Sequence, residues 1–405
     1  MAGGKSQGGV WYNIHMLKYV FILGHNPELS AAEIKAVLPQ ARLIEETSSF
    51  LILDTQPIDP KIILRQLGGT IKVGQIISQP VKPEIIVEEL KKLKLKGKLN
   101  FGISFYQSQP TGLGMTVKKQ LRSLGISCRL VTSRDKILSS VVVTKNNCHE
   151  FLVLGSLPHL SSPSLKGGGG IKGGGGSQER LAKTCAVQEF EEYSQRDYGR
   201  PVRDLVSGSM PPKLAKIMIN LAQLPASATI LDPFCGSGTI LQEALLLGYQ
   251  NVIGSDVSTK AVADTKRNLE WFVNTYQPPA KSYQLIESDV RQLSQKIKSV
   301  DAIVTEPYLG PPLKGRETKE QIQENIIILS ELYLGAFAEF KKILSADGKV
   351  IIIFPAFNLA QETLSLPILE KIKKLGFSQL NQQALVYSRP DQKVWRQIYI
   401  FSLEN

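Results

Sequence analysis

The chain has 405 residues, 42% of them hydrophobic and 21% charged, and no apolar run reaches the 18 or more residues that a membrane span needs. This length and composition predict a soluble protein of two or three domains, without a membrane segment. The four cysteines lie far apart with no Cys-x-x-Cys pair, and the four histidines include no His-x-x-x-His pair. We therefore expect neither disulfides nor a metal site, and a cytoplasmic location.

The net charge of +12 is unevenly distributed along the chain. Residues 1–176 contain 22 Lys and Arg against 11 Asp and Glu, whereas residues 177–405 contain 26 against 25. A basic front half joined to a nearly neutral rear half predicts that the front half binds a polyanion. Surface lysine that serves only solubility is the alternative.

Residues 1–80 predict a first α+β unit. Its pattern indicates a β-α-β-β-α-β order, which is typical of a ferredoxin-like unit. We expect strands at residues 19–24, 42–45, 50–54 and 70–77, a helix that begins with the capping-box pattern Ser30-Ala-Ala-Glu33, and a helix at 61–67.

Residues 81–160 predict a second unit that carries most of the basic side chains. The expected elements are helices at 85–95 and 114–124, and strands at 101–106, 128–132, 138–144 and 151–154. Solvated lysines at a helix end are an alternative explanation for the first cluster. The candidate RNA-binding residues are Lys94, Lys96, Lys98, Lys118, Lys119, Arg122, Arg129 and Arg134.

Three stretches of this unit resemble the THUMP domain of RNA-modifying enzymes: Phe101-Gly-Ile-Ser-Phe-Tyr106, Gly125-Ile-Ser-Cys-Arg129 and Leu138-Ser-Ser-Val-Val-Val143. Together with the preceding unit, the resemblance covers most of residues 17–160. It implies docking on the acceptor end of transfer RNA. Physically, we expect Lys and Arg contacts to phosphates, with strong salt dependence and little reading of base identity.

Residues 161–177 contain two runs of four glycines and predict a flexible linker to a third domain, residues 178–405. Residues 188–201 have no clear periodicity. A helix is expected over 210–221, because two prolines lie where its first turn would be.

The third domain opens with Ala228-Thr-Ile-Leu-Asp-Pro-Phe-Cys-Gly-Ser-Gly-Thr-Ile240, which predicts a strand, a glycine turn and a helix. A dinucleotide fingerprint is excluded because Leu241 stands where the third glycine is required, and no P-loop follows. The stretch resembles motif I of the class I S-adenosylmethionine-dependent methyltransferases, in the form common among enzymes that methylate base amino groups. The resemblance implies cofactor contacts from Asp232, Phe234, Cys235, Gly236, Gly238 and Thr239.

Two further strands end in acids, Asn251–Asp256 and Tyr283–Asp289. Asp256 lies where a carboxylate would accept hydrogen bonds from ribose hydroxyls. The resemblance places Asp256 and Val257 at the cofactor, gives Asp289 the adenine amino group and packs Val290 on the ring. Each acid alone is equally typical of a helix N-cap.

The fourth strand runs into Thr305-Glu-Pro-Tyr308, which resembles motif IV of base-amino methyltransferases, usually Asp/Asn-Pro-Pro-Tyr. In the ungapped register Glu306 takes the place of the acid and Pro307 that of the first proline. Aligned on Pro-Tyr instead, Thr305 takes the place of the acid. We prefer Glu306 because a carboxylate accepts an amine proton better than a hydroxyl does, and expect Tyr308 to hold the base.

The sequence therefore predicts an α/β protein, whose C-terminal class I methyltransferase domain has an antiparallel last strand. Residues 188–201 and 210–221 resemble the segment ahead of motif I in the transfer-RNA guanine-N2 methyltransferases that methylate guanosine 10. In those enzymes this segment closes over S-adenosylmethionine. An adenine or cytosine amino methyltransferase acting on other RNA or on DNA, and a non-catalytic RNA-binding protein, remain as alternatives. Cys235 as a nucleophile is disfavoured, because it lies in the cofactor turn. The sequence does not show whether a small activator subunit takes part.

Overall fold

The computed structural model describes residues 16–93, 97–155, 179–203, 210–359, 362–389 and 392–404. The expected linker at 161–177 and two candidate RNA-binding residues, Lys94 and Lys96, lie outside these ranges. Two compact units are present. One holds the start of the first strand with residues 40–63 and 73–186, and the other holds residues 22–39, 64–72 and 187–405.

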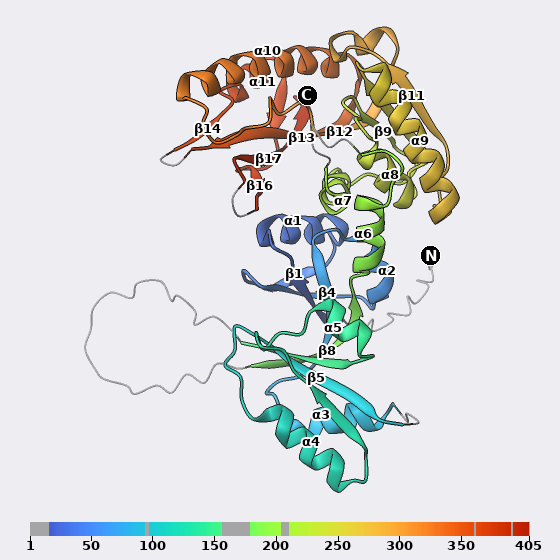
Figure 1. The fold of residues 1–405 in the computed structure, drawn as a ribbon, viewed down its shortest axis with the longest axis vertical. Helices are drawn as coiled ribbons and strands as arrows, with labels where there is room; N and C mark the ends of the chain where they lie inside the picture. Colours follow the sequence, from blue (N-terminus) through green and yellow to red (C-terminus); the bar gives the residue numbers. More distant parts are fainter. Residues whose placement is uncertain are drawn as a thin grey trace, which may run out of the picture. The chain divides into compact units, whose positions relative to one another are not determined.

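The N-terminal unit is built on an eight-stranded sheet with the strand order β2-β3-β1-β4-β8-β7-β5-β6 (Figure 1). The sheet runs through both of the expected front units without interruption. Its strands are β1 (Leu17–Leu23), β2 (Arg42–Glu46), β3 (Phe50–Thr55), β4 (Thr70–Ser78), β5 (Leu99–Tyr106), β6 (Cys128–Val131), β7 (His149–Leu154) and β8 (Arg180–Val187).

Strand β8 differs from the expected domain boundary. The sequence predicts that the C-terminal domain begins at residue 178. In the structure, β8 instead belongs to the N-terminal sheet, where it lies between β4 and β7 and pairs antiparallel with β7. The reason is long-range strand pairing, because the residues on each side of the Gly-rich stretch occupy the same sheet. A fragment ending at residue 176 would therefore lack a central strand.

The helices of the front half are α1 (Pro27–Val37), α2 (Pro60–Gln66), α3 (Pro83–Lys91), α4 (Leu113–Ser123) and α5 (Ser140–Lys145). On the second half of the sheet, α3 and α4 cover a core that includes Phe101, Val117 and Phe151. Segment 138–144, expected as a strand, forms α5. The hydroxyl of Ser139 accepts a hydrogen bond from the Val142 amide and caps this helix, which overrides the strand preference of three valines.

Helix α1 begins earlier than the capping-box pattern indicated. Pro27 lies in its first turn, and Ser30 lies inside the helix. The Ser30 hydroxyl is buried and bonds to the carbonyl oxygens of Asn26 and Gly69. The pattern was therefore a tertiary contact and not a cap.

The second unit contains a nine-stranded sheet with the order β11-β10-β9-β12-β13-β17-β15, in which β14 also pairs with β13 and β16 also pairs with β17. Strands β9 to β13 run parallel, and β17 is antiparallel to β13 as expected. The strands are β9 (Thr229–Asp232), β10 (Asn251–Asp256), β11 (Tyr283–Glu287), β12 (Val300–Thr305), β13 (Leu344–Asn358), β14 (Thr363–Ser365), β15 (Phe377–Gln379), β16 (Leu385–Tyr387) and β17 (Val394–Leu403).

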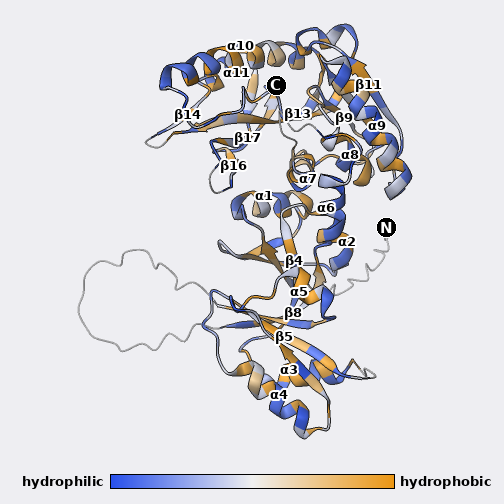
Figure 2. Ribbon diagram, viewed as in Figure 1, coloured by the Kyte–Doolittle hydropathy of each residue, from blue (hydrophilic) through white to orange (hydrophobic). Residues whose placement is uncertain are grey.

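Helices cover both faces of this sheet (Figures 1 and 2). The helices of this unit are α6 (Phe190–Tyr198), α7 (Pro212–Leu221), α8 (Thr239–Leu246), α9 (Thr259–Tyr276), the 3-10 helix η1 (Val290–Gln295), α10 (Lys319–Ile343) and α11 (Leu369–Lys374). Helix α6 lies where no periodicity was visible, since its mean hydropathy is low and only Tyr193 and Arg196 are buried.

Alternate residues of the central strands enter two separate cores. Ile230, Val304 and Ile351 pack with α7, α8 and α9, whereas Leu231 and Ile303 pack with α10 and η1. Such near-continuous apolar runs are typical of parallel strands buried on both faces. Because β9, β10, β11 and β12 are parallel, their carboxyl ends meet at one edge of the sheet, and the candidate site lies there.

Candidate functional site

Asp232 ends β9 and is almost completely buried, with 3% of its surface exposed. Its Oδ1 accepts hydrogen bonds from the Thr305 hydroxyl at 2.7 Å and from the Phe234 amide at 3.2 Å. The pKa of Asp232 is raised to about 7, mainly because the carboxyl group is buried. The negative charges of Asp256 and Glu306 raise this pKa further, whereas the hydrogen bonds from Thr305 and Phe234 lower it. Three carboxylates from three strands are thus close enough to interact.

The glycine turn after β9 leads into α8, and one of its amides contacts the carboxylate at the end of β10. Gly238 has a φ of 84°, and a Cβ added there would approach the Thr265 side chain to 2.9 Å, so only glycine fits. The Gly236 amide donates to Asp256 Oδ2 at 3.0 Å. Asp256 Oδ1 accepts from the Ser258 amide at 2.9 Å, which orients this carboxylate at the end of β10.

Beyond β11, Asp289 caps η1 by accepting from the Arg291 amide, and its carboxylate forms a forked ion pair with the Arg291 guanidinium. Hydrogen bonds from Arg291 lower the pKa of Asp289, against a small opposing effect of burial. Val290 lies in the core with 4% exposure, whereas Val257 after β10 is 69% exposed. The Ser288 amide donates to the Asp256 carbonyl oxygen, so the ends of β10 and β11 are adjacent.

Thr305 and Glu306 at the end of β12 have different surroundings. Thr305 is fully buried, and its hydroxyl is engaged by Asp232. Glu306 Oε1 accepts from Arg396 Nε at 2.5 Å, and both side chains are 15% exposed. Arg396 lies on β17, in register with Pro355 on β13, and its guanidinium packs over the Tyr387 ring.

Tyr308 follows Pro307 and is half exposed, at 50%. The Tyr333 hydroxyl on α10 donates to the Tyr308 carbonyl oxygen at 3.0 Å, and Tyr333 itself is fully buried in a core of aromatic rings. The hydrogen bond from Tyr333 therefore holds the backbone of Tyr308 in place, while the residue itself stays half exposed to solvent.

Cys235 is buried in the core beside α8, with 4% exposure. Burial raises the pKa of its thiol, and the nearby charges of Asp232 and Asp256 raise it further. A nucleophilic thiolate is disfavoured in this setting, in agreement with a small turn residue.

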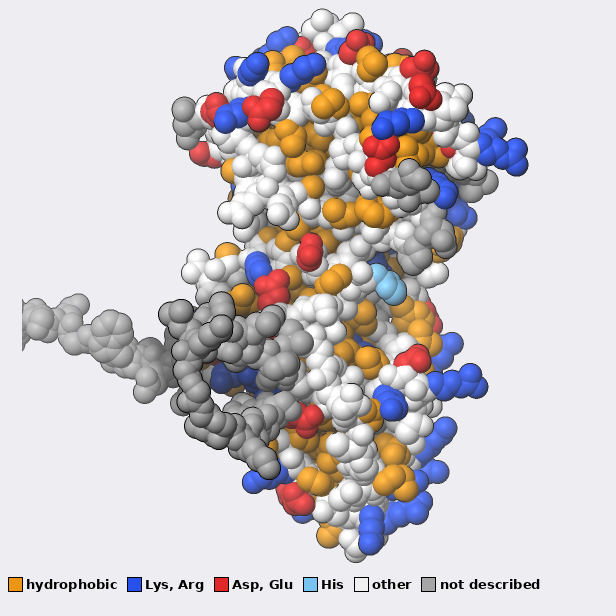
Figure 3. All heavy atoms as spheres, turned by 90° about the vertical axis from the view of Figure 1, so that its left-hand side faces the viewer, with side chains coloured by type: hydrophobic (Ala, Val, Ile, Leu, Met, Phe, Trp, Pro, Cys, Tyr) orange, Lys and Arg blue, Asp and Glu red, His pale blue; other side chains and the backbone are white. Residues whose placement is uncertain are grey.

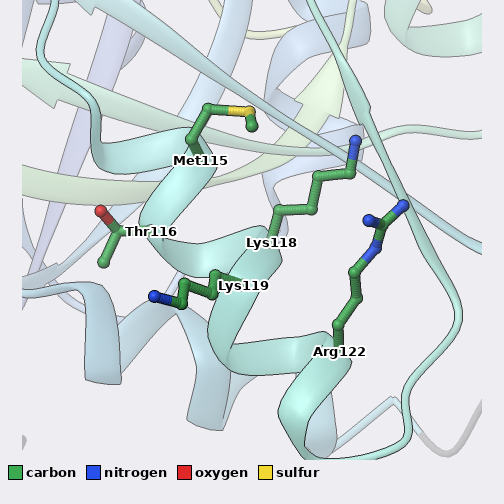
Figure 4. Close-up of a pocket in the computed structure, with 5 residues that line it drawn as sticks. All are labelled: Met115, Thr116, Lys118, Lys119 and Arg122. Carbon is green, nitrogen blue, oxygen red and sulfur yellow. The ribbon is translucent and has the colours of Figure 1, made fainter.

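The front unit carries basic side chains on α4. A hollow on this helix is lined by Met115, Thr116, Lys118, Lys119 and Arg122 (Figure 4). Lys and Arg side chains gather on the lower end of the face drawn in Figure 3, at the level of α3 and α4. The other exposed candidates are Lys98, Arg129 and Arg134.

Within the described ranges, no group of three or more His, Cys, Asp and Glu side chains is placed to hold a metal ion. No helix in the same ranges is long and apolar enough to cross a membrane.

Comparison with known proteins identifies the family to which this chain belongs. A family model described as "RMKL-like, methyltransferase domain" matches residues 200–377. The tRNA (guanine(10)-N2)-dimethyltransferase of Methanothermobacter thermautotrophicus is 42% identical over 131 residues. A protein of Methanothermococcus thermolithotrophicus, named "Probable tRNA (guanine(10)-N2)-dimethyltransferase", is 34% identical over 136 residues, which are 32% of this chain and 82% of that protein. This chain belongs to the tRNA (guanine(10)-N2)-dimethyltransferase family.

The match with this dimethyltransferase family reaches beyond the C-terminal domain. The Pyrococcus abyssi member is 24% identical over 373 residues, which are 90% of this chain and 97% of that protein. The shorter match to the M. thermautotrophicus member covers 32% of this chain and 36% of that protein, and the chain spans 48% of the Methanocaldococcus jannaschii member. The crystal structure of TrmN from Thermus thermophilus shares the fold, with a TM-score of 0.53, 15% identity, and coverage of 95% of this chain and 99% of that one.

Several residues around the site of this family member have no signal in its sequence. Arg396 and Tyr333 lie far along the chain from the residues that they contact, and Arg200 lies in a segment without periodicity. Only the pairing of β13 with β17 and the packing of α10 bring the first two to the site.

Proposed function

We propose that this chain transfers a methyl group from S-adenosylmethionine to the exocyclic N2 of a guanine in transfer RNA. The observation that carries the proposal is the position of Glu306. Its carboxylate directly follows β12, its charge acts on the buried Asp232, and Arg396 orients it. The names of the relatives favour guanine N2 over the adenine and cytosine alternatives.

The residues at the sheet edge fit the donor. S-adenosylmethionine carries a cationic sulfonium, and Asp232 and Asp256 supply negative charge beside a turn whose glycines allow close backbone approach. Asp256 would accept from the ribose hydroxyls and Asp289 from the adenine amino group, with Phe234, Gly236, Gly238 and Thr239 lining the turn. Val257 is exposed enough to contact the donor, whereas Val290 would support the ring from the core.

The chemistry then requires only positioning. The guanine N2 attacks the methyl carbon, the carbon–sulfur bond breaks, S-adenosylhomocysteine leaves, and one amine proton passes to an acceptor. Glu306 is that acceptor, and its hydrogen bond to the amine would direct the nitrogen lone pair toward the methyl group. The half-exposed ring of Tyr308 would stack on a base flipped out of the RNA.

The front unit would dock the RNA through its basic side chains. The strand order β2-β3-β1-β4 and the α4 surface support the ferredoxin-like and THUMP interpretation of this half. The single experiment that tests the proposal incubates the full chain with transfer RNA and labelled donor, followed by nucleoside analysis. Labelled N2-methyl- or N2,N2-dimethylguanosine is expected. Label in adenosine or cytidine would replace guanine as the target, and no label in any base would leave an RNA-binding protein.

The affinity for S-adenosylmethionine is expected to rise with pH. Below about pH 7 the Asp232 carboxyl is neutral, and above it the carboxylate attracts the sulfonium. Between pH 6 and 8 the ionised fraction grows, so the affinity should rise up to roughly tenfold. Calorimetric titration of the Asp232→Asn variant should lack this rise. The ionisation of the donor itself affects both proteins equally. An equal pH dependence of affinity in the wild type and in Asp232→Asn would therefore contradict the attraction between Asp232 and the sulfonium.

Binding of transfer RNA is expected to depend on the α4 cations. Replacing Lys118, Lys119 and Arg122 together by Gln should make the plot of log K against log salt less steep between 50 and 200 mM salt. The slope should fall by about 0.9 for each phosphate that these cations no longer neutralise. The whole chain is needed, because β8 completes the sheet that carries α4.

A matched triple variant on α11, with Lys371, Lys373 and Lys374 replaced by Gln, removes the same charge from the other unit. It should leave the salt slope nearly unchanged. Equal effects of the two triple variants would mean that net charge alone drives binding.

A further inference from the structure

Arg200 presents a buried cation beside the glycine turn. Arg200 follows α6 in the chain, and only 3% of its surface is exposed. The Nη1 nitrogen donates to the Thr239 hydroxyl at 2.7 Å and to the Ser237 hydroxyl at 3.2 Å. The Nε and Nη2 nitrogens are buried and have no hydrogen-bond partner.

A guanidinium in this state is costly to the folded protein. A buried donor that is left unpaired destabilises the folded state, and more so when the group is charged. The charged groups around Arg200 do not remove that cost. Asp197 attracts it from α6 and Arg203 repels it, but no described carboxylate forms an ion pair with it. The two free donors therefore point to an anionic ligand.

The location selects the kind of anion. Thr239 is the first residue of α8, so the positive end of this helix dipole adds to the charge of Arg200. Nε and Nη2 form the fork that binds a carboxylate with two parallel hydrogen bonds. A phosphate of the RNA backbone is disfavoured, because such a phosphate is hydrated and polymeric, whereas this guanidinium is nearly closed to solvent.

We propose that Arg200 binds the α-carboxylate of the methionine moiety of the methyl donor. This inference rests on the proposed function. The carboxylate is the only anionic group of S-adenosylmethionine, since its sulfonium and ammonium groups are cations and its adenosine is neutral. Arg200 and the strand-end acids would thus hold opposite charges of one ligand on the two sides of the turn.

The test compares two ligands that differ at this group. S-adenosylhomocysteine carries the carboxylate, and 5′-methylthioadenosine lacks the whole amino-acid end. By calorimetry, Arg200→Met should weaken S-adenosylhomocysteine binding about 10- to 100-fold, the value of a charge-assisted hydrogen-bond pair, and leave 5′-methylthioadenosine unchanged. Arg203→Met, which removes a neighbouring exposed cation, should change neither affinity.

Equal losses for both ligands, or no loss for either, would overturn the assignment of Arg200. Should Arg200→Met fail to fold, Arg200→Lys provides the same comparison, because a point charge cannot form the fork and should still weaken S-adenosylhomocysteine selectively. Failure of the proposed function looks different: the wild-type chain would then bind neither ligand.

Discussion

Replacing Glu306 by Gln is expected to lower the rate of methyl transfer by about 10²- to 10⁴-fold while the affinity for S-adenosylmethionine is retained. The amide keeps the shape of the side chain, and its oxygen can still accept from Arg396 Nε. It cannot take the amine proton. Single-turnover rates with transfer RNA, measured beside calorimetric donor affinity, separate the chemical step from binding.

The matched control is Glu362→Gln. Glu362 also pairs with a cation, Lys319, but lies on the surface, 43% exposed. This variant should methylate at the wild-type rate. A Glu306→Gln enzyme that does the same would remove Glu306 from the mechanism, and Thr305, the acceptor in the other register, would then require a proton path through its bond to Asp232.

Replacing Glu243 by Ala is expected to lower the free energy of unfolding by about 3–5 kcal/mol. Glu243 lies on α8, is 1% exposed, and holds two buried cations. Arg196 Nε lies 2.6 Å from its Oε1 and Lys216 Nζ lies 3.4 Å from its Oε2. Without the carboxylate, the buried Lys216 would lose its ion-pair partner, and the buried Arg196 would keep only the more distant carboxylate of Glu192.

Denaturant unfolding monitored by circular dichroism measures this effect. Glu362→Ala breaks an exposed pair and should cost no more than about 1 kcal/mol. A Glu243→Ala midpoint as high as that of the control would mean that Arg196 finds another partner. Glu192 is the nearest alternative, since its Oε2 already lies 3.6 Å from Arg196 Nη1.

The C-terminal fold was largely predictable because its signals are local. Each parallel strand is a short apolar run that ends in a polar residue, and Gly238 marks the turn where only glycine fits. Parallel strands bring such ends to one edge of the sheet. The proximity of Asp232 to Asp256 and Glu306 followed from this rule alone.

The front half and the segment just ahead of the C-terminal sheet were less predictable. Three consecutive valines favoured a strand at 138–144, yet one serine hydroxyl caps a helix there. Helix α6 shows no periodicity, because one of its two buried side chains is the charged Arg196. Strand β8 joins its sheet from beyond the expected linker, a pairing that no local pattern encodes.

The sequence by itself therefore determined the methyltransferase sheet, the row of acids at its edge and the basic character of the front half, since these depend on the order and period of neighbouring residues. Only the tertiary structure decided what holds those acids. Arg396 reaches Glu306 across 90 positions, and Thr305 closes on Asp232 across 73. Arg200 lies against the turn with two unused donors because of how the chain packs. Such contacts arise between residues far apart in the chain, where sequence spacing carries no information about distance.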